Sequence, residues 1–292
     1  MSEVDHSFSR KAKDTASGFV GGATQVLIGQ PFDLVKVRIQ TGQFKTPLEA
    51  FTKTLRNEGP LAFYKGTAAP LVGVGLCVSV QFYAFHEMKR QLLKYNNSNT
   101  LTYPQFYLAG AFAGAVNTVI TSPVEQIRIL LQTQPSGDKK LYNGPVDAVK
   151  KIWSQHGLFK GIFRGSGITL LRESQAYGVW FLTYEFLMNE TIKRTNKGRD
   201  QIPTWQLMLY GALAGEALWL SSYPLDVIKS QVQSDSFENS RYRGSAIEAF
   251  KQTWKGLGWR GLWRGIVPTL LRATPASAST FASVELALRL LG

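Results

Sequence analysis

Residues that build metal centres and disulfides are scarce in this sequence. Its 292 residues include one cysteine, Cys77, and three histidines, His6, His86 and His156. A single cysteine excludes a disulfide within the chain and a cysteine-rich zinc site. The histidines show no metal-site spacing, and the sequence contains neither a phosphate-binding glycine loop nor a nucleophile elbow. We therefore expect no metal, no cofactor and no enzymatic activity.

Acidic residues are few relative to basic ones. The chain has 33 Lys and Arg against 20 Asp and Glu, a formal net charge of +13. This balance predicts an anionic partner such as nucleic acid, acidic lipid or a negatively charged metabolite. Because the bases are spread over several loops between long segments with few charges, the pattern argues against a nucleic-acid partner.

Six segments carry few or no charges, and each is long enough to cross a bilayer as a tilted helix, which takes ~20 residues. They are 15–32, 67–86, 101–124, 165–184, 202–225 and 265–284. The mean hydropathy is only −0.09, because many Gly, Ser, Thr and Gln residues stand among the apolar ones, as in a packed bundle or around a wet cavity. The pattern predicts an all-α membrane protein with six transmembrane helices.

A ten-residue motif occurs three times, at 31–40, 123–132 and 224–233. Each copy has a proline, an acid two residues later, a base three residues after the acid, and a glutamine at its end. A repeat of roughly 100 residues overrides the two-domain expectation from length. We expect one unit of three repeats, 1–98, 99–200 and 201–292. Because proline removes a donor and bends a helix, we expect kinks at Pro31, Pro123 and Pro224.

Each motif is followed by a short amphipathic segment and then by a glycine-bounded turn. The amphipathic segments, 46–57, 143–155 and 245–255, suit surface helices that lie on the membrane without spanning it. The second copy has one extra residue between its two turn glycines, so its loop should differ. Each motif is also preceded by a pair of glycines four residues apart, a spacing that lets helix backbones approach closely. These pairs are Gly18 and Gly22, Gly110 and Gly114, and Gly211 and Gly215.

The motifs resemble those of the mitochondrial carrier family, P-x-[DE]-x-x-[KR]-x-[KR]-x-Q followed by [DE]-G-x4-[aromatic]-[KR]-G, over nearly the whole chain. Departures are Leu130 and Gln231 at the second basic position and His156 in place of the acid. The resemblance implies a monomeric carrier of the mitochondrial inner membrane that works by alternating access, with cardiolipin at the matrix side. Six spans and basic odd-numbered loops place both termini on the intermembrane-space side.

The acids and bases of the three motifs are expected to form a ring at one depth, each acid beside the base of a neighbouring repeat. These residues are Asp33, Lys36, Glu125, Arg128, Asp226 and Lys229. Charges within a membrane usually face protein or water. The ring is either a static set of ion pairs or, as the resemblance implies, a matrix-side gate whose pairs break and reform.

The opposite gate is expected to hold fewer ion pairs. The family's second motif, [FY]-[DE]-x-x-[RK], is represented by Glu87 with Arg90, but Glu185 and Glu285 have Met188 and Leu288 where a base is expected. We therefore expect this side to open more readily.

Two arginines mark a substrate site in the middle of the membrane. Arg172 and Arg272 each lie seven residues after the glycine that opens their span, roughly 10 Å along the helix, and Gly73 is the matching position of the first repeat. The resemblance implies contact points at Gly73-Val74, Arg172-Glu173 and Arg272. Arg272 suits a carboxylate and Glu173 an ammonium, so we expect an amino acid or related zwitterion.

Several alternatives stay open at this stage. The adjacent Arg-Glu pair resembles the amino-acid branch of the family, which includes carnitine and ornithine carriers, and fungal carriers of similar overall sequence favour glutamate. Gln30 stands where carnitine carriers have histidine, which argues against acylcarnitine. A proton leak or channel on the same scaffold is the alternative from another class. Helical spacing places Glu216 and Trp219 on the inward face with Asp226; Glu216 either carries a proton or, as we favour, pairs with Arg272.

Overall fold

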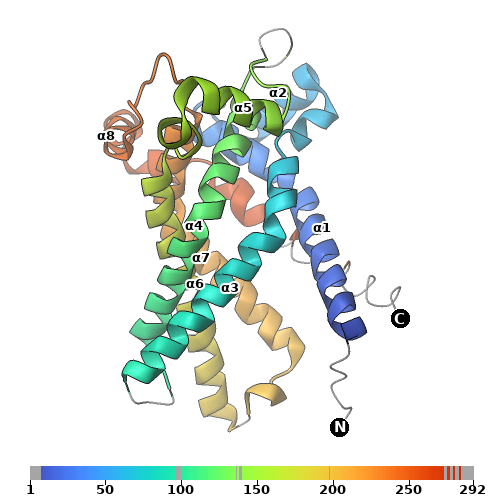
Figure 1. Ribbon diagram of the computed structural model, residues 1–292. Helices are drawn as coiled ribbons and strands as arrows, with labels where there is room; N and C mark the ends of the chain where they lie inside the picture. Colours follow the sequence, from blue (N-terminus) through green and yellow to red (C-terminus); the bar gives the residue numbers. More distant parts are fainter. Residues whose placement is uncertain are drawn as a thin grey trace.

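The computed structural model describes residues 8–96, 100–135, 137, 140–196, 198–272, 275–276, 279 and 283, without the side chains of 8–19, 72, 74, 75 and 200. All regular structure within these residues is helical (Figure 1). Five helices are long. They are α1 (Phe8–Gln40), α3 (Ala68–Tyr95), α4 (Tyr103–Thr133), α6 (Ser166–Thr195) and α7 (Thr204–Ser234).

Five of the six segments predicted from the sequence lie in the long helices, apart from one or two residues at their starts, and a further helical stretch begins at 266. Helix α4 packs against both α3 and α6, α6 packs against α7, and α1 contacts α3, α4 and α7. The prolines of the three motifs lie inside α1, α4 and α7, which continue through them. In the part of the chain that the structure describes, no helix is both long and apolar enough to be identified as a membrane span.

Three short helices lie at one end of the long ones, as Figure 1 shows. They are α2 (Pro47–Glu58), α5 (Pro145–His156) and α8 (Ala246–Leu257). Side-chain oxygens of Thr46 and Ser245 cap the first turns of α2 and α8 by accepting from backbone N–H groups. Apolar side chains remain exposed on all three helices, among them Leu48, Val146 and Ile247. The three predicted amphipathic helices are therefore confirmed, with bounds within a few residues.

The turns that follow the short helices differ as the spacing of their glycines predicts. Segments η1 (Pro60–Tyr64) and η5 (Gly258–Trp263) are 3₁₀ turns, whereas η3 (Leu158–Ile162) is a π-helical turn. A π turn closes its hydrogen bond over five residues and a 3₁₀ turn over three, so the wider turn accommodates the extra residue of the second repeat. The prediction of a distinct second loop is confirmed.

The glycine pair of the second repeat brings α4 and α6 into backbone contact. A Cβ atom added at Gly114 would lie 2.3 Å from the carbonyl oxygen of Glu173, and one at Gly110 would lie 2.4 Å from that of Tyr177. The predicted close approach is therefore present here. No described residue lies within 4 Å of a Cβ added at Gly211 or Gly215. The α4–α6 contact fixes the position of Glu173 and of its neighbour Arg172.

Candidate functional site

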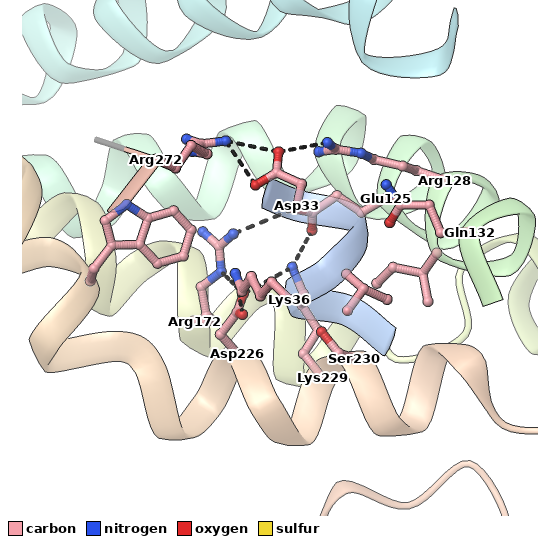
Figure 2. A pocket seen from close by; sticks show the side chains of 13 residues that line it. Asp33, Lys36, Glu125, Arg128, Gln132, Arg172, Asp226, Lys229, Ser230 and Arg272 are labelled. Atoms are coloured by element: carbon pink, nitrogen blue, oxygen red, sulfur yellow. Dashed lines mark hydrogen bonds and ion pairs between the residues drawn. The ribbon is translucent and has the colours of Figure 1, made fainter. Parts of the chain in front are cut away.

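The three Pro-acid-base motifs bring their charged side chains together between α1, α4 and α7 (Figure 2). Each acid contacts the base of another repeat at 2.7 Å. The pairs are Asp33 with Arg128, Glu125 with Lys229, and Asp226 with Lys36. Because acid and base stand three residues apart on one face of each helix, three crossing helices close the set into a ring. Each acid thus stands beside the base of a neighbouring repeat, as expected from the sequence.

Glutamine side chains brace two members of this ring. Gln40, which ends the first motif, donates through Nε2 to Asp226 Oδ2 at 3.0 Å. Gln30 accepts from Arg128 at 2.5 Å and donates to the backbone carbonyl of Lys65 at 2.8 Å. Gln30 is fully buried, so in this conformation its amide holds Arg128 and does not face the cavity.

Both arginines expected at the substrate site are joined to the ring. Arg172 lies 2.7 Å from Glu173, 3.4 Å from Glu125 and 3.5 Å from Asp226. Arg272 contacts Asp33 at 2.8 Å. The expected pairing of Arg272 with Glu216 is wrong, because Asp33 on α1 reaches the guanidinium instead.

Trp219 lies beside three of these cations. Lys36 Nζ is 4.2 Å from the centroid of the indole ring, and the guanidinium carbons of Arg172 and Arg272 are 5.8 and 5.9 Å from it. A cation within about 6 Å of an aromatic centroid is attracted by the ring quadrupole. The indole is therefore part of the charge network, as its place on the inward face of α7 predicts.

The remaining positions expected at the substrate site are less accessible. Glu173 is only 2% exposed. A Cβ added at Gly73, which is buried, would meet Val124 of α4 at 3.6 Å, so Gly73 packs against a neighbouring helix. The side chain of Val74 and all of Glu285 lie outside the described residues. Glu216 is half-buried, and no ion pair or hydrogen bond joins its carboxylate to the described residues.

The cavity among these side chains is small, about 70 Å³. Ring residues, Arg172, Arg272 and Trp219 line it. Pockets for small ligands typically occupy ~300–1,000 Å³, so the closed ring leaves too little room for a metabolite. Binding at these residues requires the ion pairs to rearrange.

At the opposite end the structure corrects the sequence-based expectation. Glu185 of α6 forms a bidentate ion pair with Arg199, whose nitrogens lie 2.8 and 2.9 Å from its oxygens. Arg199 belongs to η4 (Arg199–Gln201), between the second and third repeats. Glu185 therefore has a basic partner after all, supplied from outside the motif. Glu87 pairs with Arg90 on the same helix, and Arg90 is largely exposed.

Sequence reasoning missed an ion pair beside the short helices. Arg164 contacts Asp235 at 3.2 Å, and both side chains are less than 10% exposed. The guanidinium also lies 4.7 Å from the ring of Phe237, whose other neighbour is the stacked ring of His156. Burial lowers the pKa of Arg164 while Asp235 opposes the shift. The only sequence signal was an acid two residues after the third motif.

The first repeat has a second ion-pair set that the other repeats lack. Arg38 contacts Glu58 at 2.5 Å, and Lys65 contacts the same carboxylate. At the matching positions, Leu130 stands with His156 in the second repeat, and Gln231 stands with Leu257 in the third. The acid that corresponds to Glu58 is therefore replaced in the third repeat as well as in the second. Both of these repeats also lack the base that corresponds to Arg38.

Comparisons with known proteins agree with this threefold construction. The profile of the family described as mitochondrial carrier protein matches residues 9–96, 99–195 and 200–292. The mitochondrial glycine transporter YMC1 of Saccharomyces cerevisiae is 46% identical, covering 98% of this chain and 94% of the relative. The glutamate/glycine mitochondrial carrier ymc1 of Schizosaccharomyces pombe is 43% identical, covering 94% and 92%. The mitochondrial basic amino acids transporter of Bos taurus is 38% identical, covering 95% and 91%.

The three profile matches each contain one Pro-acid-base motif, and the relatives align over almost their full length. Motif, helix order and overall similarity therefore point to the same assignment. This chain belongs to the mitochondrial carrier family.

Proposed function

We propose that this carrier moves a small amino acid across the mitochondrial inner membrane by alternating access, with the glutamate and glycine class favoured. One observation carries the proposal: Arg172 and Arg272, at matching positions of two repeats, face a common cavity and contact the acids of the charge ring. Guanidinium groups bind carboxylates in a planar, often bidentate geometry. A substrate carboxylate is the ligand that these arginines suit.

The balance of charge around the cavity supports a substrate with a carboxylate. The network contains five bases, Lys36, Arg128, Arg172, Lys229 and Arg272, and four acids, Asp33, Glu125, Glu173 and Asp226. An excess of base favours an anionic group and disfavours a cationic amino acid such as ornithine. The two yeast relatives are named as a glycine transporter and a glutamate/glycine carrier, which agrees with this class.

The distribution of side chains supports six membrane-spanning helices. The network charges point inward, whereas large apolar side chains are exposed on the outer faces of the helices, for example Leu108 and Val119 of α4 and Leu209 and Leu220 of α7. Lipid stabilises such an arrangement, because it solvates apolar faces and excludes charge. In this arrangement both termini face the intermembrane space, and α2, α5 and α8 lie at the matrix surface.

In this proposal the ring acts as the matrix gate, and its three ion pairs, all formed here, hold the gate closed. Its six residues lie in the last third of α1, α4 and α7, toward the helix ends that lead into α2, α5 and α8. Figure 2 shows how their side chains meet. Buried ion pairs gain little net stability because desolvation offsets their attraction, so pairs that break and reform separate two states of similar energy. A substrate moves this equilibrium only by binding the intermediate conformations better than the end states.

The test is uptake by the purified protein in liposomes. Labelled glycine and glutamate are offered outside, with and without the same amino acid inside, and ornithine and carnitine serve as comparison substrates. We expect saturable uptake of glycine or glutamate that internal amino acid stimulates. Flux that neither saturates nor distinguishes these compounds would instead show a leak.

A further inference from the structure

Trp219 occupies the point at which the cations of the network converge. Lys36 Nζ, 4.2 Å from the ring centroid, is the nearest of them, and the two guanidinium groups lie more than 1 Å farther away. The indole lines the cavity and is half-buried. Among aromatic side chains, tryptophan offers the strongest face for a cation. A ring in this position selects among the cations that reach it.

Lys36 is held on this ring by one carboxylate. Its ammonium contacts Asp226 at 2.7 Å, and its other aromatic neighbour, Tyr223, is farther away at 5.6 Å. The ammonium therefore lies between an anion and an indole face. A second ammonium that reached the ring would take the place of Lys36.

Glu173 does not offer a substrate ammonium the place expected from the sequence. Its carboxylate is nearly fully buried and lies 2.7 Å from Arg172. A new cation would have to displace that guanidinium from a buried site. The face of Trp219, directly on the cavity, is more accessible to the ammonium of a substrate.

A single amino acid spans the two contact points. The guanidinium of Arg272 lies 5.9 Å from the centroid of the Trp219 ring. The amino nitrogen and the carboxyl carbon of an α-amino acid are roughly 2.5 Å apart by standard bond geometry. A carboxylate on Arg272 therefore leaves the ammonium within reach of the indole.

We propose that Trp219 is a specificity-determining residue: Lys36 occupies its ring face in the closed carrier, and the ammonium of the substrate replaces Lys36 there. The substrate carboxylate meanwhile replaces Asp33 on Arg272. Asp33 and Lys36 stand three residues apart on α1, so one zwitterion takes one contact from each charge of the first repeat, while Arg128 and Asp226 remain beside them. This inference rests on the proposed transport of an amino acid and explains why both of its charged groups are needed.

The test compares Trp219→Leu and Trp219→Phe with the unchanged carrier in liposomes. Glutamate uptake is measured in competition with unlabelled glutamate and with glutarate, which lacks the amino group. We expect Trp219→Leu to weaken inhibition by glutamate about tenfold and to leave inhibition by glutarate unchanged, with Trp219→Phe in between. A merely structural role would weaken both compounds equally, and that result would overturn the proposal. Trp205→Leu, a change of an exposed tryptophan on the same helix, is the matched control.

A second measurement separates this inference from the proposed function. Amine labelling of Lys36 is followed by mass spectrometry, and we expect both Trp219→Leu and added glutamate to increase it. If the unchanged carrier takes up no amino acid, the proposed function fails. If uptake is normal but Trp219→Leu alters neither selectivity nor Lys36 labelling, the function stands and the role of Trp219 is overturned.

Discussion

Arg272 donates through Nη1 to both carboxylate oxygens of Asp33, at 3.0 and 2.8 Å. The same carboxylate accepts from Arg128 at 2.7 Å, so one acid of the first repeat joins bases of the second and third. A residue assigned to substrate binding and a residue assigned to the gate thus form one ion pair. Binding of a substrate carboxylate and closure of the gate compete for the same guanidinium.

Replacement of Arg272 tests this competition. Arg272→Ala should lower the uptake efficiency, kcat/KM, by about 10- to 100-fold, as expected for the loss of a charge-assisted hydrogen bond. Asp33 keeps Arg128 as its partner, so the folded protein should survive. Uptake in liposomes and thermal unfolding of the purified protein measure the two effects. Near-normal uptake would remove Arg272 from the site, and Arg194→Ala, at an exposed pair with Glu190 outside both gates, serves as control.

The pair of Lys36 and Asp226 tests whether the ring is a coupled unit. Lys36→Gln leaves Asp226 without its 2.7 Å partner, and Asp226→Asn does the same to Lys36, in side chains that are each less than 10% exposed. Arg172 and Lys229 stay 3.5 and 3.6 Å from Asp226, but each single variant still leaves a buried charge without its nearest partner, which is costly. The double variant should therefore lose less stability than the two single variants together. Thermal unfolding of all four proteins measures the coupling.

Strict additivity in that cycle would show that the two side chains do not act as a pair. The control is Lys53 and Glu49 of α2, an ion pair with side chains 56% and 32% exposed. Exposed pairs contribute about 0.2–1 kcal/mol. Glutamine at either position should therefore change the melting temperature little.

The sequence predicted the ring because helical periodicity places an acid and a base three residues apart on the same face. The threefold repeat sets Asp33, Glu125 and Asp226 at the same depth, so pairing around a pseudo-threefold axis needs no further information. The order of the helices and the surface helices followed from charge gaps and amphipathic spacing in the same way. Membrane insertion, by contrast, remains a proposal drawn from the exposed apolar faces.

Contacts that depend on the path of a loop or on a choice between equivalent partners were not predictable. Arg199 reaches Glu185 from a link outside any motif, and Arg164 reaches Asp235 across two repeats. Arg272 had Glu216 and Asp33 as possible partners, and periodicity alone places both on inward faces. The observed choice depends on how closely α1 approaches the last repeat, which local sequence patterns do not specify.

Because α4 packs closely on α6, adding one methyl group at their contact should lower the stability of the protein. In Gly114→Ala the new Cβ would lie 2.3 Å from a backbone oxygen of Glu173, and backbone atoms cannot move aside as flexible side chains do. Overpacking of this kind costs about 1–3 kcal/mol. We expect a melting temperature several degrees lower and reduced uptake, because Arg172 follows the displaced helix.

Gly167→Ala is the matched control for that change. Gly167 is exposed near the start of α6, and no described atom lies within 4 Å of an added Cβ. Alanine there should be neutral or slightly stabilising, because it restricts the unfolded chain. Equal melting temperatures for the two variants would show that α4 and α6 are not in close contact at Gly114.

Asp235 should be the most important acid of the loop between α7 and α8. Its carboxylate contacts Arg164 and accepts from the backbone N–H groups of Arg241 and Tyr242 at 3.0 and 2.9 Å. Asp235→Ala removes the ion-pair partner of the buried guanidinium, which keeps the backbone carbonyls of Asp235 and Ser236, and leaves the two loop N–H groups without their acceptor. We expect a loss of about 3 kcal/mol, the low end of the range for a broken buried ion pair. Asp235→Asn retains one acceptor oxygen and should be intermediate.

Thermal unfolding and protease sensitivity between α7 and α8 measure this loss. The control is Asp147→Ala on α5, whose pair with Lys151 is exposed, with side chains 31% and 41% accessible. Its effect should stay within the range of a surface ion pair, about 0.2–1 kcal/mol. If Asp235→Ala were no more destabilising than Asp147→Ala, the link between the second and third repeats would be a surface contact. In that case the two repeats would be free to move independently when the gate opens.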